Sequence, residues 1–132
     1  MNPDLKEKLL ASRAAAREQV PAIKAAKTVE ELHGCLRRYV LAKYLLEDDG
    51  EDRLDELTGM SVAQAAKLDR RLLEDVDTSQ ECTGSTSVMR KRVLLLMAMQ
   101  KDFEVELDPG LAAEAATLRD LARMVFVGLH DR

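Results

Sequence analysis

The sequence of 132 residues contains no tryptophan, and aromatic residues make up only 3% of it. Such a chain offers no platform on which nucleic-acid bases stack, and its net charge of -4 does not favour a phosphate backbone. No apolar run approaches the roughly 18 residues of a membrane-spanning helix, and the first residues lack the apolar core of a signal peptide. We therefore expect no binding to nucleic acid or membrane.

Cysteine and histidine are also scarce, with two of each. The cysteines lie far apart and do not form a disulfide framework, so we expect a cytoplasmic protein with reduced thiols. His33 has no cysteine or histidine at metal-ligand spacing, and no metal site is expected. There is no Ser-His-Asp arrangement and no phosphate-binding loop. The sequence therefore favours a protein that is not an enzyme.

Apolar residues make up 46% of the chain and charged residues 33%, which is typical of a folded domain. The apolar positions recur at helical spacing, and no alternating run predicts a strand. We expect an all-α protein with an N-terminal helical arm over residues 1–27 and a helical domain over residues 28–132. Pro21 is expected to end or kink the helix of the arm.

Capping signals predict where the helices of the domain begin. Thr28 with Glu31 predicts a helix that runs to about Glu47, and Ser61 with Gln64 predicts another that ends near Val76. Between them we expect a single helical turn around Leu54. Two further starts lie near the C-terminus: Asp108 followed by Pro109 for a short helix, and Thr117 with Asp120 for the last one.

The most apolar segment follows a polar loop and covers residues 88–103. Residues 93–99 carry no charge, and a helix that is apolar nearly all round is a buried helix, so we place it at the centre of the fold. A hydroxyl of Ser85, Thr86 or Ser87 is expected to cap its N-terminus. An exposed hydroxyl in that position also suits a phosphate, because free N–H groups and the helix dipole favour an anion there.

Four short stretches of the chain resemble the acyl carrier proteins, the phosphopantetheine-binding carriers. The stretch at residues 84–88 resembles the motif G-x-D-S-L, and residues 94–103, 105–109 and 117–121 resemble the family's central helix, the loop after it and the start of its last helix. The resemblance implies an acyl-carrier-like four-helix bundle with an extra helix in the first loop. It also implies 4'-phosphopantetheine on Ser87, with Ser85 as the second choice, carrying an acyl or aminoacyl group for the enzymes of an acyl-transfer pathway.

Two departures from the family motif leave an alternative open. Thr86 stands where the family has an aspartate, and Ser87 is about two residues further from Phe103 than the family's serine would be. If the apolar register of the central helix is used instead, Met89 takes the serine position and no attachment site remains. The chain would then be a carrier-like binding module, an adaptor without a prosthetic group that docks on a partner enzyme.

Under this alternative, the partner-binding residues are Arg90, Lys91 and Arg92, which would meet an acidic partner. A third hypothesis concerns Cys82, which precedes the helix N-terminus and has Arg90 and Lys91 one turn inside the helix. Such a setting lowers the pKa of a thiol and favours a nucleophile or sulfur acceptor.

Overall fold

A computed structural model describes residues 3–72 and 84–130, with side chains described over residues 7–64 and 88–130. These residues form six α-helices, so the prediction of an all-α protein is confirmed for the described part of the chain. The helices are α1 (Pro3–Ala25), α2 (Val29–Tyr44), α3 (Leu54–Leu72), α4 (Gly84–Phe103), α5 (Pro109–Glu114) and α6 (Leu118–His130).

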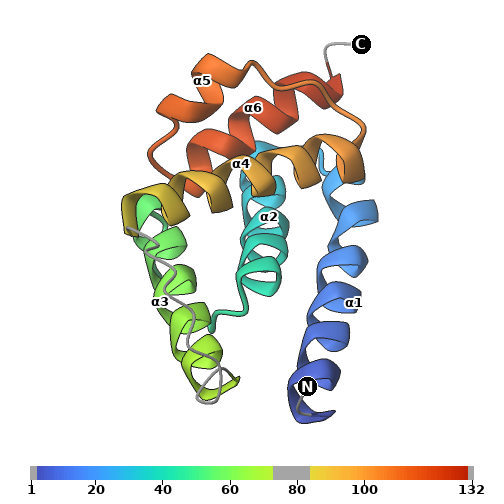
Figure 1. Ribbon diagram of the computed structural model, residues 1–132. Coiled ribbons are helices and arrows are strands. Elements are labelled where there is room, and N and C mark those ends of the chain that lie inside the picture. The colour runs from blue at the N-terminus through green and yellow to red at the C-terminus, as the bar shows by residue number, and fades with distance from the viewer. Residues whose placement is uncertain (1–2, 73–83, 131–132) are drawn as a thin grey trace.

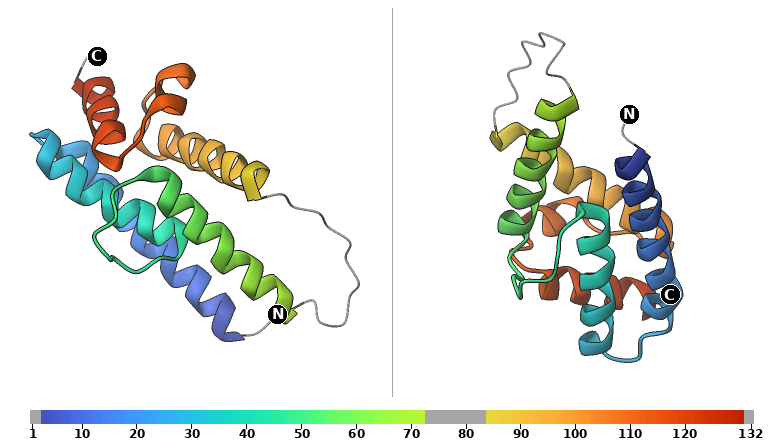
Figure 2. Two further views of the ribbon diagram at one scale, coloured as in Figure 1. Left: turned by 90° about the vertical axis from the view of Figure 1, so that its left-hand side faces the viewer. Right: turned by 90° about the horizontal axis from the view of Figure 1, so that it is seen from below.

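The helix α2 lies at the centre of the arrangement. In Figures 1 and 2, α1 and α3 flank α2, and α4 crosses over the ends of all three. The helix α6 packs on α2, and α5 lies beside α6. Because α2 contacts α1, α3 and α6, its side chains form the middle of the core, including Leu32, Leu36, Tyr39 and Val40, which are all fully buried.

The N-terminal helix α1 packs along α2. Its residues Ala16 and Ile23, together with Ala26 just beyond it, belong to the same buried cluster as the core of α2 and α6. Pro21 is expected to end or kink the arm's helix; it lies inside α1, so the helix does not end there. Pro21 is exposed, on the side of α1 away from Ile23, and the helix continues past it to Ala25 with Ile23 fully buried, which favours the continued helix.

Three predicted helix starts are confirmed. The Thr28 side chain accepts a hydrogen bond from the Glu31 amide at 3.1 Å, and Asp108 accepts from the Gly110 amide at 2.8 Å. At the start of α6, the Thr117 hydroxyl accepts from the Asp120 amide at 3.1 Å, while the Asp120 carboxylate accepts from the Thr117 amide at 3.2 Å. In each case a polar side chain satisfies N–H groups that have no partner within the helix.

The predicted start at Ser61 is wrong, because α3 runs without a break from Leu54. Ser61 is buried in the middle of this helix, where its hydroxyl donates to the Tyr44 carbonyl oxygen at 3.0 Å. The predicted end of this helix near Val76 lies outside the described residues. The end predicted for α2 near Glu47 also differs, since α2 stops at Tyr44 and Leu45 adopts the left-handed conformation with φ of 58°.

The helix α4 is not buried all round, so this prediction is also wrong. Leu95, Met99 and Phe103 face the core, whereas Val93, Leu94 and Met97 are 52%, 56% and 58% exposed. The helix crosses over the other helices (Figure 1), and in the part of the chain that the structure describes the side chains on one of its faces pack against the core. The backbone of α4 begins at Gly84, so Ser85, Thr86 and Ser87 lie in its first turn and not before it.

Candidate functional site

The inner face of α4 fixes the position of the helix on the core. Phe103 packs against Tyr39 of α2 with ring centroids 4.8 Å apart. Met99, one helical turn before Phe103, is fully buried. The Tyr39 hydroxyl donates to the Asp102 carboxylate at 2.7 Å, and the ammonium of Lys43 lies 3.9 Å from the same carboxylate. Burial, followed by the nearby carboxylate, raises the pKa of Tyr39.

Arg92 anchors α4 nearer the middle of the helix. Its guanidinium donates to the Asp55 carboxylate at 2.9 Å and to the Ala115 carbonyl oxygen at 2.9 Å. It also reaches the carbonyl oxygens of Ala112 and Ala113, at 3.2 Å and 3.3 Å. Ala112 and Ala113 lie in the last turn of α5, and Ala115 is the residue that follows it. The Ala112 carbonyl oxygen also accepts from the Ala115 amide at 3.3 Å, and Arg92 supplies a donor to all three carbonyl oxygens at this helix end. Arg92 therefore joins α3, α4 and α5 through one side chain.

Lys91 anchors the same region to α2 and α3. Its ammonium donates to the Ser61 hydroxyl at 2.6 Å and lies 5.7 Å from the centre of the Tyr44 ring. The Tyr44 hydroxyl lies 3.0 Å from the Thr58 hydroxyl, which itself donates to the Leu54 carbonyl oxygen at 2.7 Å. The proton between the two hydroxyls therefore comes from Tyr44. Burial raises the pKa of Tyr44 above its ordinary value.

The three cations that the sequence predicts for partner binding thus lie in different environments. Arg90 is exposed, whereas Lys91 and Arg92 make the intramolecular contacts described above. Their positions on the helix explain the difference. Arg92 precedes Leu95 and Met99 by three and seven residues, which places it on the inner side of the helix.

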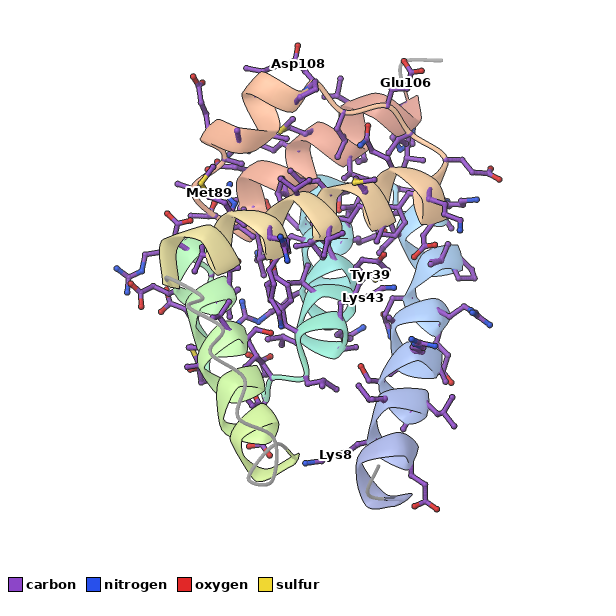
Figure 3. All side chains as sticks on the ribbon, in the orientation of Figure 1. Lys8, Tyr39, Lys43, Met89, Glu106 and Asp108 are labelled. Carbon is purple, nitrogen blue, oxygen red and sulfur yellow. The ribbon has the colours of Figure 1, made fainter. Side chains whose placement is uncertain are left out.

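The outer face of α4 carries four large apolar side chains: Met89, Val93, Leu94 and Met97. They are 68%, 52%, 56% and 58% exposed. Met89, Val93 and Met97 follow one another at intervals of four residues and form one stripe along the helix. Figure 3 shows Met89 near the start of α4, at the side of the molecule.

Two exposed cations, Arg90 and Lys101, lie on this same outer face among the apolar side chains. The only acidic residue of α4 is Asp102, which is held toward Tyr39. The face is therefore apolar and positively charged, although the chain as a whole has a net charge of -4. We call Met89, Arg90, Val93, Leu94, Met97 and Lys101 the outer face of α4.

The sequence did not predict that Val93, Leu94, Met97 and Lys101 lie at the surface. In residues 93–99 every position is apolar, so the sequence shows no alternation of apolar and polar residues from which the buried side of the helix could be predicted. The signal lies in the flanking residues: Lys91, Arg92 and Asp102 mark the edges of the inner face, and their polar atoms have partners there.

The structure describes the predicted serines at the start of α4 by their backbones alone. The backbones of Ser85 and Ser87 lie in the first turn of α4, and their side chains are outside the described residues. Cys82 lies outside the described residues altogether. Cys35 of α2 is partly buried against the core.

A polar cluster around Asp52 joins the loop after α2 to α6. Asp52 accepts from His33 at 2.7 Å and from Arg37 at 3.3 Å, and its backbone carbonyl accepts from the Leu118 amide at 2.8 Å. Asp48 accepts two further hydrogen bonds from Arg37, which lower the pKa of Asp48. These polar groups pair with one another, and their hydrogen bonds fix the loop after α2 against α2 and α6. Over the described residues, no three acidic, histidine or cysteine side chains are grouped to hold a metal ion.

Comparison with known proteins adds no relative. The chain matches no protein-family model, no curated protein sequence and no solved structure. Within the described residues, no helix is both long enough and apolar enough to span a membrane.

Proposed function

We propose that this chain is a helical docking module whose outer face of α4 binds an acidic and partly apolar surface on a partner protein. The observation that carries the proposal is that face itself. It combines four large exposed apolar side chains with Arg90 and Lys101 and contains no carboxylate. Exposed apolar patches bordered by charge are typical of protein interfaces.

The apolar side chains provide the contact area, and the cations determine which partner surface is favoured. Methionine is unbranched and polarizable, and Met89 and Met97 suit a surface that must adapt to a partner. Arg90 and Lys101 favour an acidic surface and raise the rate of encounter with it. Contacts from Lys91, Arg92 and Asp102 hold α4 in place before binding, which lowers the ordering cost of association.

An acyl-carrier-like fold is part of the proposal. The helices α2, α4, α5 and α6 follow the order of the carrier bundle, with α3 as the additional helix in the first loop and α1 as the N-terminal arm. In the register that aligns the apolar residues, Met89 takes the place of the modified serine. Met89 is 68% exposed on the outer face of α4, which favours a docking module over a carrier.

A carrier function is the second candidate, and the position of Ser87 supports it. The backbone of Ser87 lies in the first turn of α4, and the exposed Arg90 follows three residues later in the sequence. A guanidinium in that position suits the phosphate of a phosphopantetheine arm. Such an arm supplies a thiol to which an acyl or aminoacyl group is tethered for acyl-transfer enzymes, and this chain itself performs no chemistry.

Charge reversal on the outer face tests the docking proposal. A tagged chain is used to capture partners, first as wild type and then with Arg90→Glu and Lys101→Glu. The control is Lys27→Glu with Arg38→Glu, two exposed cations away from α4, which gives the same change of net charge. The captured partner is purified, and its Kd for each variant is measured. We expect the face variant to weaken binding by tenfold or more, and the control to remain within about twofold of wild type.

Two results contradict the docking proposal. One is equal weakening by the face variant and the control, which would reflect net charge alone. The other is binding of the wild-type chain, but not of the face variant, to vesicles of anionic lipid, which would assign the outer face to a membrane surface.

Intact mass separates the carrier from the plain docking module. After co-expression with a promiscuous phosphopantetheinyl transferase, a carrier gains the mass of one phosphopantetheine. Ser87→Ala abolishes this gain, whereas Ser85→Ala does not. If Ser85→Ala alone removes the gain, Ser85 is the modified residue; if wild type gains no mass, the carrier function is wrong.

A further inference from the structure

A second surface on the chain has the opposite charge and the same apolar character. It is a groove of about 790 Å³ between the segment after α4, the short helix α5 and the last helix α6. Its acidic wall contains Glu104, Glu106 and Asp108, and Leu111, Met124 and Val127 supply apolar lining. Figure 3 shows Glu106 and Asp108 on the side of the molecule beyond α4, away from Met89.

The acidic wall follows from an alternating segment. Val105 and Leu107 are buried, at 5% and 6% exposure, so the side chains between and beside them point outward. Gln100 of α4 holds the segment: its carbonyl oxygen accepts from the Val105 amide at 3.2 Å, and its side chain accepts from the Leu107 amide at 3.0 Å. The three carboxylates therefore lie on one edge of the groove, where Glu104 also pairs with Lys24 at 3.1 Å and Asp108 caps α5.

The apolar lining is accessible. Leu111 and Val127 are each 59% exposed, and Met124 is partly buried against the core. Arg123 is the one cation among the residues that line the groove. The groove is thus acidic along one wall and apolar along the other, which are the properties that the outer face of α4 requires of a partner.

We infer that the groove binds the outer face of α4 of a second copy of this chain. The inference rests on the proposed function, because it names one partner for the same face. Arg90 and Lys101 of one copy would lie near Glu104, Glu106 and Asp108 of the next. Met89, Val93, Leu94 and Met97 would cover Leu111 and Val127.

The two surfaces cannot meet within one molecule. The inner face of α4 is held by Arg92 and Asp102, and Gln100 ties the acidic segment to the same helix. The outer face of α4 therefore points away from the groove of its own chain. Since the two surfaces differ, their contact is heterologous, and each pairing leaves one face and one groove free. The chain is expected to associate head to tail in a concentration-dependent way.

Sedimentation of two complementary variants tests this arrangement. The face variant carries Arg90→Glu with Lys101→Glu, and the groove variant carries Glu106→Lys with Val127→Lys. All four residues are exposed, and Asp108 is spared because it caps α5. Wild type is expected to grow beyond a dimer as its concentration rises, and less so in high salt. Each variant alone is expected to stay monomeric.

The equimolar mixture of the two variants is the decisive sample. The groove of the face variant and the α4 of the groove variant are both intact, so the mixture should regain association that neither variant shows alone, beginning with a one-to-one dimer. The two altered surfaces carry reversed and therefore complementary charges, so growth beyond the dimer is also compatible with the pairing of face with groove. The control Lys27→Glu with Arg38→Glu should associate as wild type does. Circular dichroism confirms that each variant keeps its helical content.

Several outcomes would overturn the inference. A wild-type chain that stays monomeric up to near-millimolar concentration excludes self-association. A mixture that fails to form the dimer excludes the pairing of face with groove, and so does a variant that self-associates as wild type does. Failure here is distinct from failure of the proposed function: a face variant that still loses its captured partner shows that α4 docks on another protein and not on this chain.

Discussion

Neighbouring residues of the same charge have different roles on α4. Arg92 satisfies the carbonyl oxygens at the end of α5 and pairs with Asp55, whereas Arg90, two positions earlier, is exposed. The role of each arginine depends on the side of the helix from which it projects, and the difference can be measured.

Replacing Arg92 by alanine should destabilise the fold. Arg92→Ala removes the donors for the carbonyl oxygens at the end of α5, and we expect the free energy of unfolding to fall by about 1–3 kcal/mol. Urea unfolding followed by circular dichroism measures this change. The matched control, Arg90→Ala, should stay within about 0.5 kcal/mol of wild type. Equal losses in the two variants would show that Arg92 is not an anchor.

A second prediction concerns the Asp120 carboxylate. Hydrogen bonds from the backbone amides of Ala116 and Thr117 hold the pKa of Asp120 below its usual value. A carboxyl with a lowered pKa in the folded state stabilises the fold above its unfolded pKa, which is near 4, and this contribution is lost as the pH falls through the folded pKa.

Unfolding by urea at a series of acidic pH values tests the role of Asp120. Wild type should lose more stability than Asp120→Asn as the pH is lowered below about 4. The asparagine variant has no group to titrate at this position, although its side-chain oxygen can still accept a hydrogen bond. Parallel pH profiles for the two chains would contradict the prediction.

At the scale of single helices, the continuity of α3 makes a further prediction. Gly59 lies inside α3, and a Cβ atom built on it meets nothing within 4 Å. Gly59→Ala should therefore raise the free energy of unfolding by about 0.5–1 kcal/mol, because glycine is a poor residue in a helix. Thermal and urea unfolding both measure this gain.

Gly50 provides the control for Gly59. Its φ is +89°, in the left-handed region that side chains disfavour, although the space around it is also open. Gly50→Ala should destabilise the chain by about 1–2 kcal/mol. If Gly59→Ala left the free energy of unfolding unchanged or lowered it, α3 would not be continuous through Gly59. The helix would then be interrupted near Ser61, where the capping pattern predicted its start.

The comparison of sequence and structure shows which local signals are reliable here. Thr28 and Asp108 cap their helices as predicted, because an exposed polar side chain before an apolar stripe has no competing partner. Ser61 carries the same signal but is buried, and its hydroxyl bonds to the backbone of α2 and to Lys91. A capping pattern therefore does not distinguish a helix start from a polar contact between helices.

The outer face of α4 shows the opposite limit. Hydrophobic periodicity predicts which side of a helix is buried only when its other side is polar. On α4 both sides are apolar, so burial of Leu95 and exposure of Leu94 have no separate signature in the sequence. The groove could not be predicted from the sequence either, because it combines residues from α5, α6 and the segment before them.

At the scale of the whole molecule, α1 is expected to unfold together with the rest of the chain. Ile23 is fully buried in the common core, whereas Leu10 on the same helix is 55% exposed. Ile23→Ala should cost about 2–4 kcal/mol of global stability, because it leaves a cavity beside α2. Leu10→Ala should change stability by less than about 0.5 kcal/mol.

The measurement is urea unfolding followed in parallel by circular dichroism and by the fluorescence of the two tyrosines of α2. If α1 were an independent arm, Ile23→Ala would leave the tyrosine transition unchanged and shift only a part of the circular dichroism signal. Coincident shifts of both signals identify a single cooperative unit.

The burial of Tyr39 and Tyr44 has a consequence for alkaline solution. The chain has no tryptophan and no other tyrosine, and the pKa of each phenol is raised by burial. Groups with a raised pKa stabilise the folded state below their unfolded pKa, near 10, and that contribution is lost as the pH rises toward the folded pKa. Phenolate absorbance should therefore appear abruptly in strong base, when the helices unfold and expose the two tyrosines. Ultraviolet absorbance alone then follows alkaline denaturation without an added dye or label.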